Sequence, residues 1–146
     1  DNLDTLKQVY HPRIVFQDPL HKVEGLAPLT DYFQHLYQNV ISCQFSINKH
    51  FEIENGGCLY WTMSLRHPSL NRGNTIFIEG HSLLEIKDGL VISHRDYFDI
   101  GSMLYEQLPL LGNLIKYVKI HVNRHISKGL TCNLQKNMHF LVGKFK

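Results

Sequence analysis

The chain has 146 residues, 43% of them hydrophobic, and its eight Phe, seven Tyr and single Trp supply bulk for a core or a cavity wall. This size and composition predict one globular domain with a substantial core. No stretch approaches the roughly 18 consecutive apolar residues of a membrane-spanning helix, and no secretory leader pattern is visible. Three widely spaced cysteines without a CxxC motif argue against a disulfide framework or a zinc site, and favour the cytoplasm.

The net charge of +2 conceals a division along the chain. Residues 1–106 carry all 13 acidic side chains and 8 of the 15 basic ones, whereas residues 107–146 carry seven basic side chains and no acid. A basic end of this kind is either a solvated tail or a contact for an anionic partner such as lipid headgroups. We expect no nucleic-acid partner. The basic region lacks interleaved aromatic residues, and it contains no known DNA- or RNA-binding motif.

The first forty residues predict two helices and a strand. Apolar residues at helical spacing predict a helix over 3–10 that Pro12 ends. A short strand follows over 13–17, and Asp18-Pro19 turns the chain. We expect Thr30 to cap a second helix, whose apolar face carries Tyr32, Phe33, Leu36, Tyr37 and Val40.

The middle of the chain predicts four long antiparallel strands, over 43–54, 58–66, 75–87 and 90–99. Asn55-Gly56-Gly57 and Asp88-Gly89 are strong turn signals between them. In the second strand, alternation places Leu59, Trp61, Met63 and Leu65 on one face. Strands that follow helices in this order predict an α+β domain with helices on one face of a sheet.

Helical spacing returns after Ser102, and Pro109 divides it. We expect a short helix to Gln107 and a second over 110–122, so that one domain covers 1–122 and includes a C-terminal helical segment over 102–122. Residues 123–146 form a basic tail without a clear period.

The segment His94-Arg95-Asp96-Tyr97-Phe98-Asp99 concentrates charged groups on the fourth strand. Alternation places His94, Asp96 and Phe98 on one face. An Asp in an apolar cavity has a raised pKa and becomes a usable acid or base near neutral pH, with His94 as a proton relay. The alternative is a purely structural Asp96 that is paired with a cation such as Arg66, Arg72 or Arg95.

Other polar residues carry two interpretations each. Asp18 either faces the same cavity or caps its own turn, and Glu79 and His81 are either pocket groups or part of an exposed face. Trp61 and Met63 are expected in a cavity wall rather than at a cofactor. Ten scattered His residues, with only His121 and His125 at i, i+4 spacing and no acid or Cys near them, predict neither a metal site nor a cofactor.

Four segments together resemble a known family: VYHPRIVFQDPLHKVEG (9–25), TDYFQHLYQN (30–39), YWTMSLRHP (60–68) and EGHSLLEIKDGLVISHRDYFDIGSMLYEQLPLLGNLIKYVK (79–119). They resemble the SnoaL-like branch of the nuclear transport factor 2-like superfamily, which includes ketosteroid isomerases, limonene epoxide hydrolases and polyketide cyclases. The stretch LYEQLPLLG resembles a bacterial subfamily of mostly uncharacterised members.

The resemblance implies a cone, in which a strongly bent antiparallel sheet is wrapped by N-terminal helices around an apolar pocket, often dimeric through the outer face of the sheet. It places Asp96 where the family has a catalytic carboxylate. The Arg and Asp that epoxide hydrolases need on the strand at 60–63 are absent. Asp18 and Asp96 match the two carboxyl groups of the isomerases, with Tyr10, Tyr32 and Tyr37 open as the third group.

We therefore expect an isomerase, cyclase or hydrolase in which Asp96 is the general acid or base and His94 supports it, acting on a lipid- or polyketide-like substrate. The alternatives are a non-catalytic carrier of an apolar ligand, and a protein that docks on a membrane or a partner through 108–146. Residues 108–122 then close the pocket, form a homodimer contact or touch an anionic membrane weakly. The expected ligand-binding residues are Asp18, Tyr32, Phe33, Leu36, Trp61, Met63 and Phe98.

Overall fold

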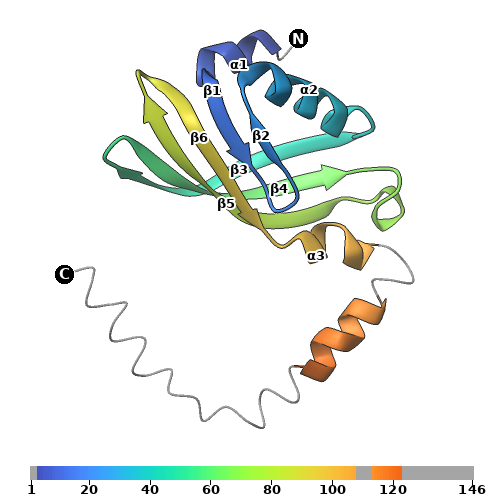
Figure 1. Cartoon of the computed structure of the whole chain (residues 1–146). Helices are drawn as coiled ribbons and strands as arrows, with labels where there is room; N and C mark the ends of the chain where they lie inside the picture. Colours follow the sequence, from blue (N-terminus) through green and yellow to red (C-terminus); the bar gives the residue numbers. More distant parts are fainter. Residues whose placement is uncertain (1–2, 108–112, 123–146) are drawn as a thin grey trace, which may run out of the picture.

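The computed structural model describes residues 3–107 and 113–122 (Figure 1). The elements, in chain order, are α1 (Leu3–Val9), β1 (Tyr10–Gln17), β2 (Lys22–Glu24), α2 (Leu26–Tyr37), β3 (Ser42–Ile53), β4 (Gly56–Arg66), the 3₁₀ turn η1 (Asn71–Gly73), β5 (Ile76–Lys87), β6 (Leu90–Phe98), α3 (Ile100–Met103) and the 3₁₀ turn η2 (Tyr105–Gln107). A further helix covers 113–122. Within the described ranges, every helix is too short or too polar to cross a membrane.

The strands form one sheet in the order β2-β1-β6-β5-β4-β3. Figure 1 shows α1 and α2 over one face of this curved sheet, so the predicted α+β class is confirmed. The sheet is mixed, however, because β1 pairs in parallel with β6. We expected an antiparallel sheet throughout. Strands joined by a hairpin must be antiparallel, whereas residues 18–89 separate β1 from β6, so these two strands are free of that constraint.

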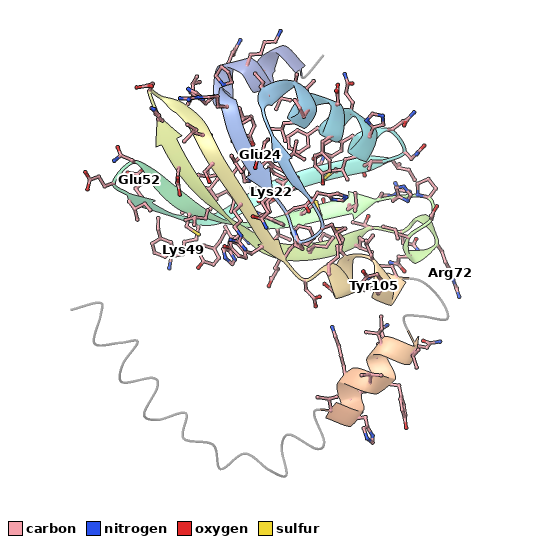
Figure 2. The ribbon with its side chains drawn as sticks, viewed as in Figure 1. Lys22, Glu24, Lys49, Glu52, Arg72 and Tyr105 are labelled. Carbon is pink, nitrogen blue, oxygen red and sulfur yellow. The ribbon has the colours of Figure 1, made fainter. Side chains whose placement is uncertain are left out.

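The N-terminal strand differs from its prediction in length and in its neighbours. β1 begins at Tyr10 rather than at Arg13, and its register on β6 jumps between Tyr10 and Val15. Pro12 lies inside this jump and has no N–H to donate to a neighbouring strand. The three-residue strand β2 was not predicted, because so short a segment shows no period; its Lys22 and Glu24 are ion-paired side by side (Figure 2).

Helix α2 starts earlier than the sequence indicated. Gly25, at φ +95°, occupies the N-cap position, so the expectation of Thr30 as N-cap is wrong. Pro28 falls in the first turn of the helix, where no backbone N–H is needed, and therefore does not delay the helix.

The chain beyond β6 turns at Asp99. Its Oδ1 accepts hydrogen bonds from the backbone N–H groups of Gly101 (2.8 Å) and Ser102 (3.3 Å), so Asp99 is the N-cap of α3 rather than the end of a strand. The second predicted helix is present over 113–122, while 108–112 and the predicted tail over 123–146 lie outside the described residues.

The hairpin between β5 and β6 contains a bulge that sets the face of the candidate site. Asp88 and Gly89 both have positive φ (53° and 79°), as a type I′ turn requires. Val91 pairs with Ile86, but Ser93 pairs with Glu85, which leaves Ile92 as an extra residue. From there on the register is displaced by one, and a one-residue shift exchanges the faces of a strand.

Two groups of buried side chains lie under the helices. The predicted alternation in β4 is confirmed, since Trp61, Met63 and Leu65 are buried with Ile76 and Ile78 of β5. The second group joins β1 to α2 and consists of Tyr10, Ile14, Phe16 and Leu29.

We expect Gly80→Ala to lower the free energy of unfolding by about 1–3 kcal/mol, as overpacking does in other cores. Gly80 lies opposite Trp61, and a Cβ at this position would be 2.3 Å from the indole Cη2 atom. Urea unfolding followed by circular dichroism measures the change. Glu79→Ala, on the exposed neighbour, is the control and should change stability by less than about 0.5 kcal/mol. Equal stabilities of the two variants would contradict the packing described here.

Candidate functional site

A cavity of about 290 Å³ lies between α2, one face of the sheet and α3. All seven residues predicted to contact a ligand lie in its wall, together with Asp96: Asp18, Tyr32, Phe33, Leu36, Trp61, Met63 and Phe98. The wall also contains residues that the sequence reasoning did not assign to the site: Phe16, Leu20, His21, Tyr37, Val40, Cys43, Phe45, Leu65, His67, Leu70, Met103 and Leu104. Helical spacing from Phe33 pointed to Tyr37 and Val40, whereas nothing local indicated Met103 or Leu104.

Asp96 is held in this wall through one of its two carboxyl oxygens. Its Oδ1 accepts a hydrogen bond from Ser82 Oγ (2.5 Å) and lies 2.9 Å from His94 Nε2. Ser82 in turn accepts from Trp61 Nε1 (2.8 Å). An indole N–H only donates, so the single Ser82 hydroxyl proton is directed at Asp96. Among the described residues no hydrogen bond involves Asp96 Oδ2, and every buried side-chain oxygen has a partner, so Oδ2 is the exposed oxygen.

His94 lies behind Asp96 rather than in the cavity wall. Its Nδ1 is 2.8 Å from the hydroxyl of Tyr10. Burial, and then the charge of Asp96, raise the pKa of Tyr10 well above its usual value of 10.0, so the phenol keeps its proton. A carboxylate oxygen only accepts, so His94 Nε2 donates to Asp96 Oδ1, and in the neutral imidazole Nδ1 then accepts from the Tyr10 hydroxyl. The shared face of His94 and Asp96 follows the predicted alternation.

The alternative of an Asp96 paired with arginine does not describe this structure. Arg95 lies over the Tyr97 ring, 4.9 Å from its centre, and Arg66 donates to the Gly73 carbonyl oxygen. Figure 2 shows Arg72 on the loop between β4 and β5, pointing away from the sheet. Within the described residues, the basic side chain in contact with Asp96 is that of His94, through the hydrogen bond from its Nε2.

Asp18 fulfils both of its interpretations. Its Oδ1 accepts from the backbone N–H groups of Leu20 and His21, both at 2.7 Å, which caps the turn. Its Oδ2 accepts a hydrogen bond from the Tyr32 hydroxyl, and the carboxyl group borders the cavity. Burial, followed by this hydrogen bond, raises the pKa of Tyr32 above its usual value. Both oxygens of Asp18 are thus engaged, unlike those of Asp96.

Tyr37 contributes a second hydroxyl group to the cavity wall, after that of Tyr32. Burial raises its pKa to about 12, with smaller contributions from Cys43 and Asp96. Burial also raises the pKa of the Cys43 thiol, and a hydrogen bond with Tyr37 offsets part of that increase. Tyr37 is therefore a protonated donor at neutral pH. Of the three tyrosines left open by the sequence, Tyr37 borders the cavity, Tyr32 is bound to Asp18, and Tyr10 is bound to His94.

Glu79 and His81 lie on the opposite face of the sheet from the cavity. Glu79 is exposed, and the His81 ring stacks between Tyr60 (5.4 Å) and Tyr97 (4.8 Å). Their interpretation as pocket groups is wrong. In the described part of the chain, no three His, Cys, Asp or Glu side chains gather as a metal-binding group.

A second hollow, of about 330 Å³, adjoins the cavity where β1 and β6 end. Gln17, Pro19, Arg95 and Tyr97 line it together with three residues that also line the main cavity: Asp18, Asp96 and Phe98. Asp96 is therefore bordered by two hollows.

The comparisons with known proteins agree with this fold. The model of the SnoaL-like domain family matches residues 1–94, more than half of the chain, and the chain therefore belongs to this family. A search of curated proteins found no match to the sequence.

Solved structures with the same fold are distant in sequence. A protein with a ketosteroid isomerase-like fold from Catenulispora acidiphila, in complex with trimethylamine, is 13% identical, covers 74% of this chain and 84% of its own, and has a TM-score of 0.66. A candidate SnoaL-like polyketide cyclase from Shewanella denitrificans is 22% identical, with 70% and 82% covered and a TM-score of 0.62. TerC, co-crystallised with polyporic acid, is 15% identical, with 69% and 82% covered and a TM-score of 0.62.

We expect Ser82→Ala to lower the free energy of unfolding by about 1–3 kcal/mol, because it leaves the buried Trp61 N–H without an acceptor. Urea unfolding monitored by Trp61 fluorescence measures this. Ser46→Ala, on an exposed position of β3, is the matched control and should be close to neutral. A neutral effect of Ser82→Ala would show that the Trp61–Ser82–Asp96 chain does not stabilise the fold.

Proposed function

We propose that this protein is an acid–base enzyme that transfers a proton on a small, largely apolar substrate. Asp96 is the catalytic residue, and His94 supports it. The observation that carries the proposal is the asymmetry of Asp96: Oδ1 is held by Ser82 and His94, while Oδ2 has no partner among the described residues. A base needs such an oriented carboxylate with one oxygen available to the substrate.

The reaction that suits these groups is proton transfer at a carbon next to a carbonyl group. Asp96 Oδ2 takes the proton from that carbon, the C–H electron pair forms a C=C bond, and the carbonyl oxygen becomes an enolate. Tyr37 keeps its proton because its pKa is raised, and its hydroxyl donates to that oxygen in place of Cys43. Return of the proton to another carbon completes an isomerisation. Attack of the enolate carbon on a second carbonyl group instead closes a ring, and the alkoxide formed from that carbonyl group takes the proton back from Asp96.

The shape and chemistry of the cavity limit the substrate. Aromatic and aliphatic side chains form most of the wall, with Asp18 and Asp96 as the carboxyl groups in it. A compact, mostly apolar polyketide- or lipid-like molecule with one or two carbonyl groups fits this lining. Epoxide hydrolysis is not proposed, because Tyr60-Trp61-Thr62-Met63 lacks the charged pair of the epoxide hydrolases.

The same cavity also suits a non-catalytic carrier of an apolar ligand, since the polar groups around Asp96 are already hydrogen-bonded to one another. The two functions differ in what Asp96 does. A carrier needs only the volume and the apolar wall, whereas the enzyme needs the Asp96 carboxylate.

We expect the protein to catalyse deuterium exchange next to the carbonyl group of 2-tetralone in D₂O, followed by proton NMR. Asp96→Asn, which keeps the size of the side chain, should slow this exchange by about 10²–10⁴-fold, the usual contribution of a general base. Glu79→Gln removes a carboxylate from the outer face of the same sheet and should leave the rate unchanged. Equal rates for wild type and Asp96→Asn would exclude Asp96 as the base.

Binding is measured separately from exchange. Trp61 is the single tryptophan of the chain and lies in the cavity wall, so its fluorescence should respond to an occupant. Polyporic acid, the ligand of TerC, is a suitable probe. We expect Asp96→Asn to keep its affinity for this probe within about fivefold while it loses exchange activity. Binding by the wild type without any catalysed exchange would support the carrier instead.

A further inference from the structure

Helix 113–122 exposes an apolar face. At 100° per residue, its large apolar side chains fall within one broad arc, apart from Ile120. Most of that arc is open to solvent, with exposed fractions of 59% for Leu114, 67% for Tyr117, 49% for Val118 and 46% for Val122. Figure 1 shows the helix apart from the sheet, so the core of the domain does not cover this face.

The charge of this region has one sign. Lys116 and Lys119 lie on the arc opposite the apolar face, and residues 107–146 contain seven basic side chains and no acidic one. The acidic side chains all lie in residues 1–106. A helix with an apolar face, flanking lysines and no acid is complementary to an anionic, partly apolar surface.

The helix lies next to the element that closes one side of the cavity. Lys119 Nζ is 3.4 Å from Asp99 Oδ2, and Asp99 caps α3. Met103 of α3 and the adjoining Leu104 form part of the cavity wall. The exposed apolar face and the cavity are therefore on neighbouring parts of the molecule.

We propose that helix 113–122 docks on the surface of an anionic membrane. Its apolar face enters the boundary between headgroups and acyl chains, and the positive charge on its polar side adds attraction to the anionic headgroups. A helix with an apolar face and basic residues on its other side is suited to lie along the surface of a bilayer. Docking brings α3 close to the lipid, which gives an apolar substrate a short path from the membrane to the cavity. The docking itself does not depend on the catalytic role of Asp96.

The test is flotation of the full chain with phosphatidylcholine vesicles, with and without phosphatidylglycerol. We expect binding to the anionic vesicles alone, weakening as salt is raised. Lys116→Glu changes the net charge of the helix by two units. Each basic charge near the surface raises the constant for partition onto anionic vesicles about fivefold, so this variant should lower that constant by about 30-fold. The double variant Leu114→Ser/Val118→Ser removes two large side chains from the apolar face and should abolish binding to the vesicles.

Matched controls carry the same changes elsewhere. Lys87→Glu, at the exposed end of β5, and Phe77→Ser, on the outer face of the sheet with 72% of its surface exposed, should bind like the wild type. Circular dichroism checks that each variant is folded, and deuterium exchange of 2-tetralone in solution tests the acid–base proposal independently.

Three outcomes would overturn the docking proposal. The first is equal binding to neutral and anionic vesicles, or binding to neither. The second is unchanged binding of both helix variants, which would assign any membrane contact to another part of the chain. The third is a loss of dimer mass in Leu114→Ser/Val118→Ser without a change in vesicle binding, which would make the apolar face a contact between two copies of this chain.

Discussion

A carboxylate in an apolar cavity needs hydrogen-bond donors, and the structure around the cavity depends on the groups that donate to Asp96. The hydrogen bonds come from β5 and β6, through Ser82 and His94, and these two are in turn bonded to Trp61 of β4 and Tyr10 of β1. Four strands therefore supply one chain of polar groups, and an unsatisfied member would cost about 1–3 kcal/mol. The same chain holds the Trp61 ring over Gly80, where no Cβ obstructs it. The same strand registers thus determine both the hydrogen bonds of the buried polar groups and the packing of the Trp61 ring.

The two carboxyl groups of the cavity have different tasks because their surroundings use different numbers of their oxygens. Asp18 gives one oxygen to its own turn and the other to Tyr32, which joins the β1–β2 turn to α2. Asp96 gives one oxygen to the network, and the other has no partner among the described residues. This asymmetry, rather than the presence of two acids, is the reason that Asp96 and not Asp18 is proposed as the reactive carboxylate. The second hollow borders Asp96 from another side, where β1 and β6 end.

The division of charge along the chain corresponds to a division of the molecule. The acidic segment forms the sheet, the covering helices and the cavity, while the acid-free segment begins where α3 and η2 end. The ion pair between Lys119 and Asp99 connects the two segments. It is exposed and therefore weak, so screening by salt or competition from lipid phosphates can release it. An apolar cavity beside a basic amphipathic helix is a coherent arrangement for a substrate that partitions into lipid.

The sequence by itself determined the features that depend on near neighbours: the alternating faces of β4 and β6, the Asp88-Gly89 turn, the apolar face of α2, and the resemblance that singled out Asp96. It also placed every expected ligand-contacting residue on a face that borders the cavity. Only the tertiary structure decided which residues meet Asp96. A hairpin without a bulge would put His81 opposite Asp96, whereas the extra residue Ile92 puts Ser82 there. The parallel pairing of β1, and with it the bond from Tyr10 to His94, joins residues 84 positions apart. Bulges and distant strand pairings are fixed by the packing of the whole sheet, and a local pattern does not contain that information.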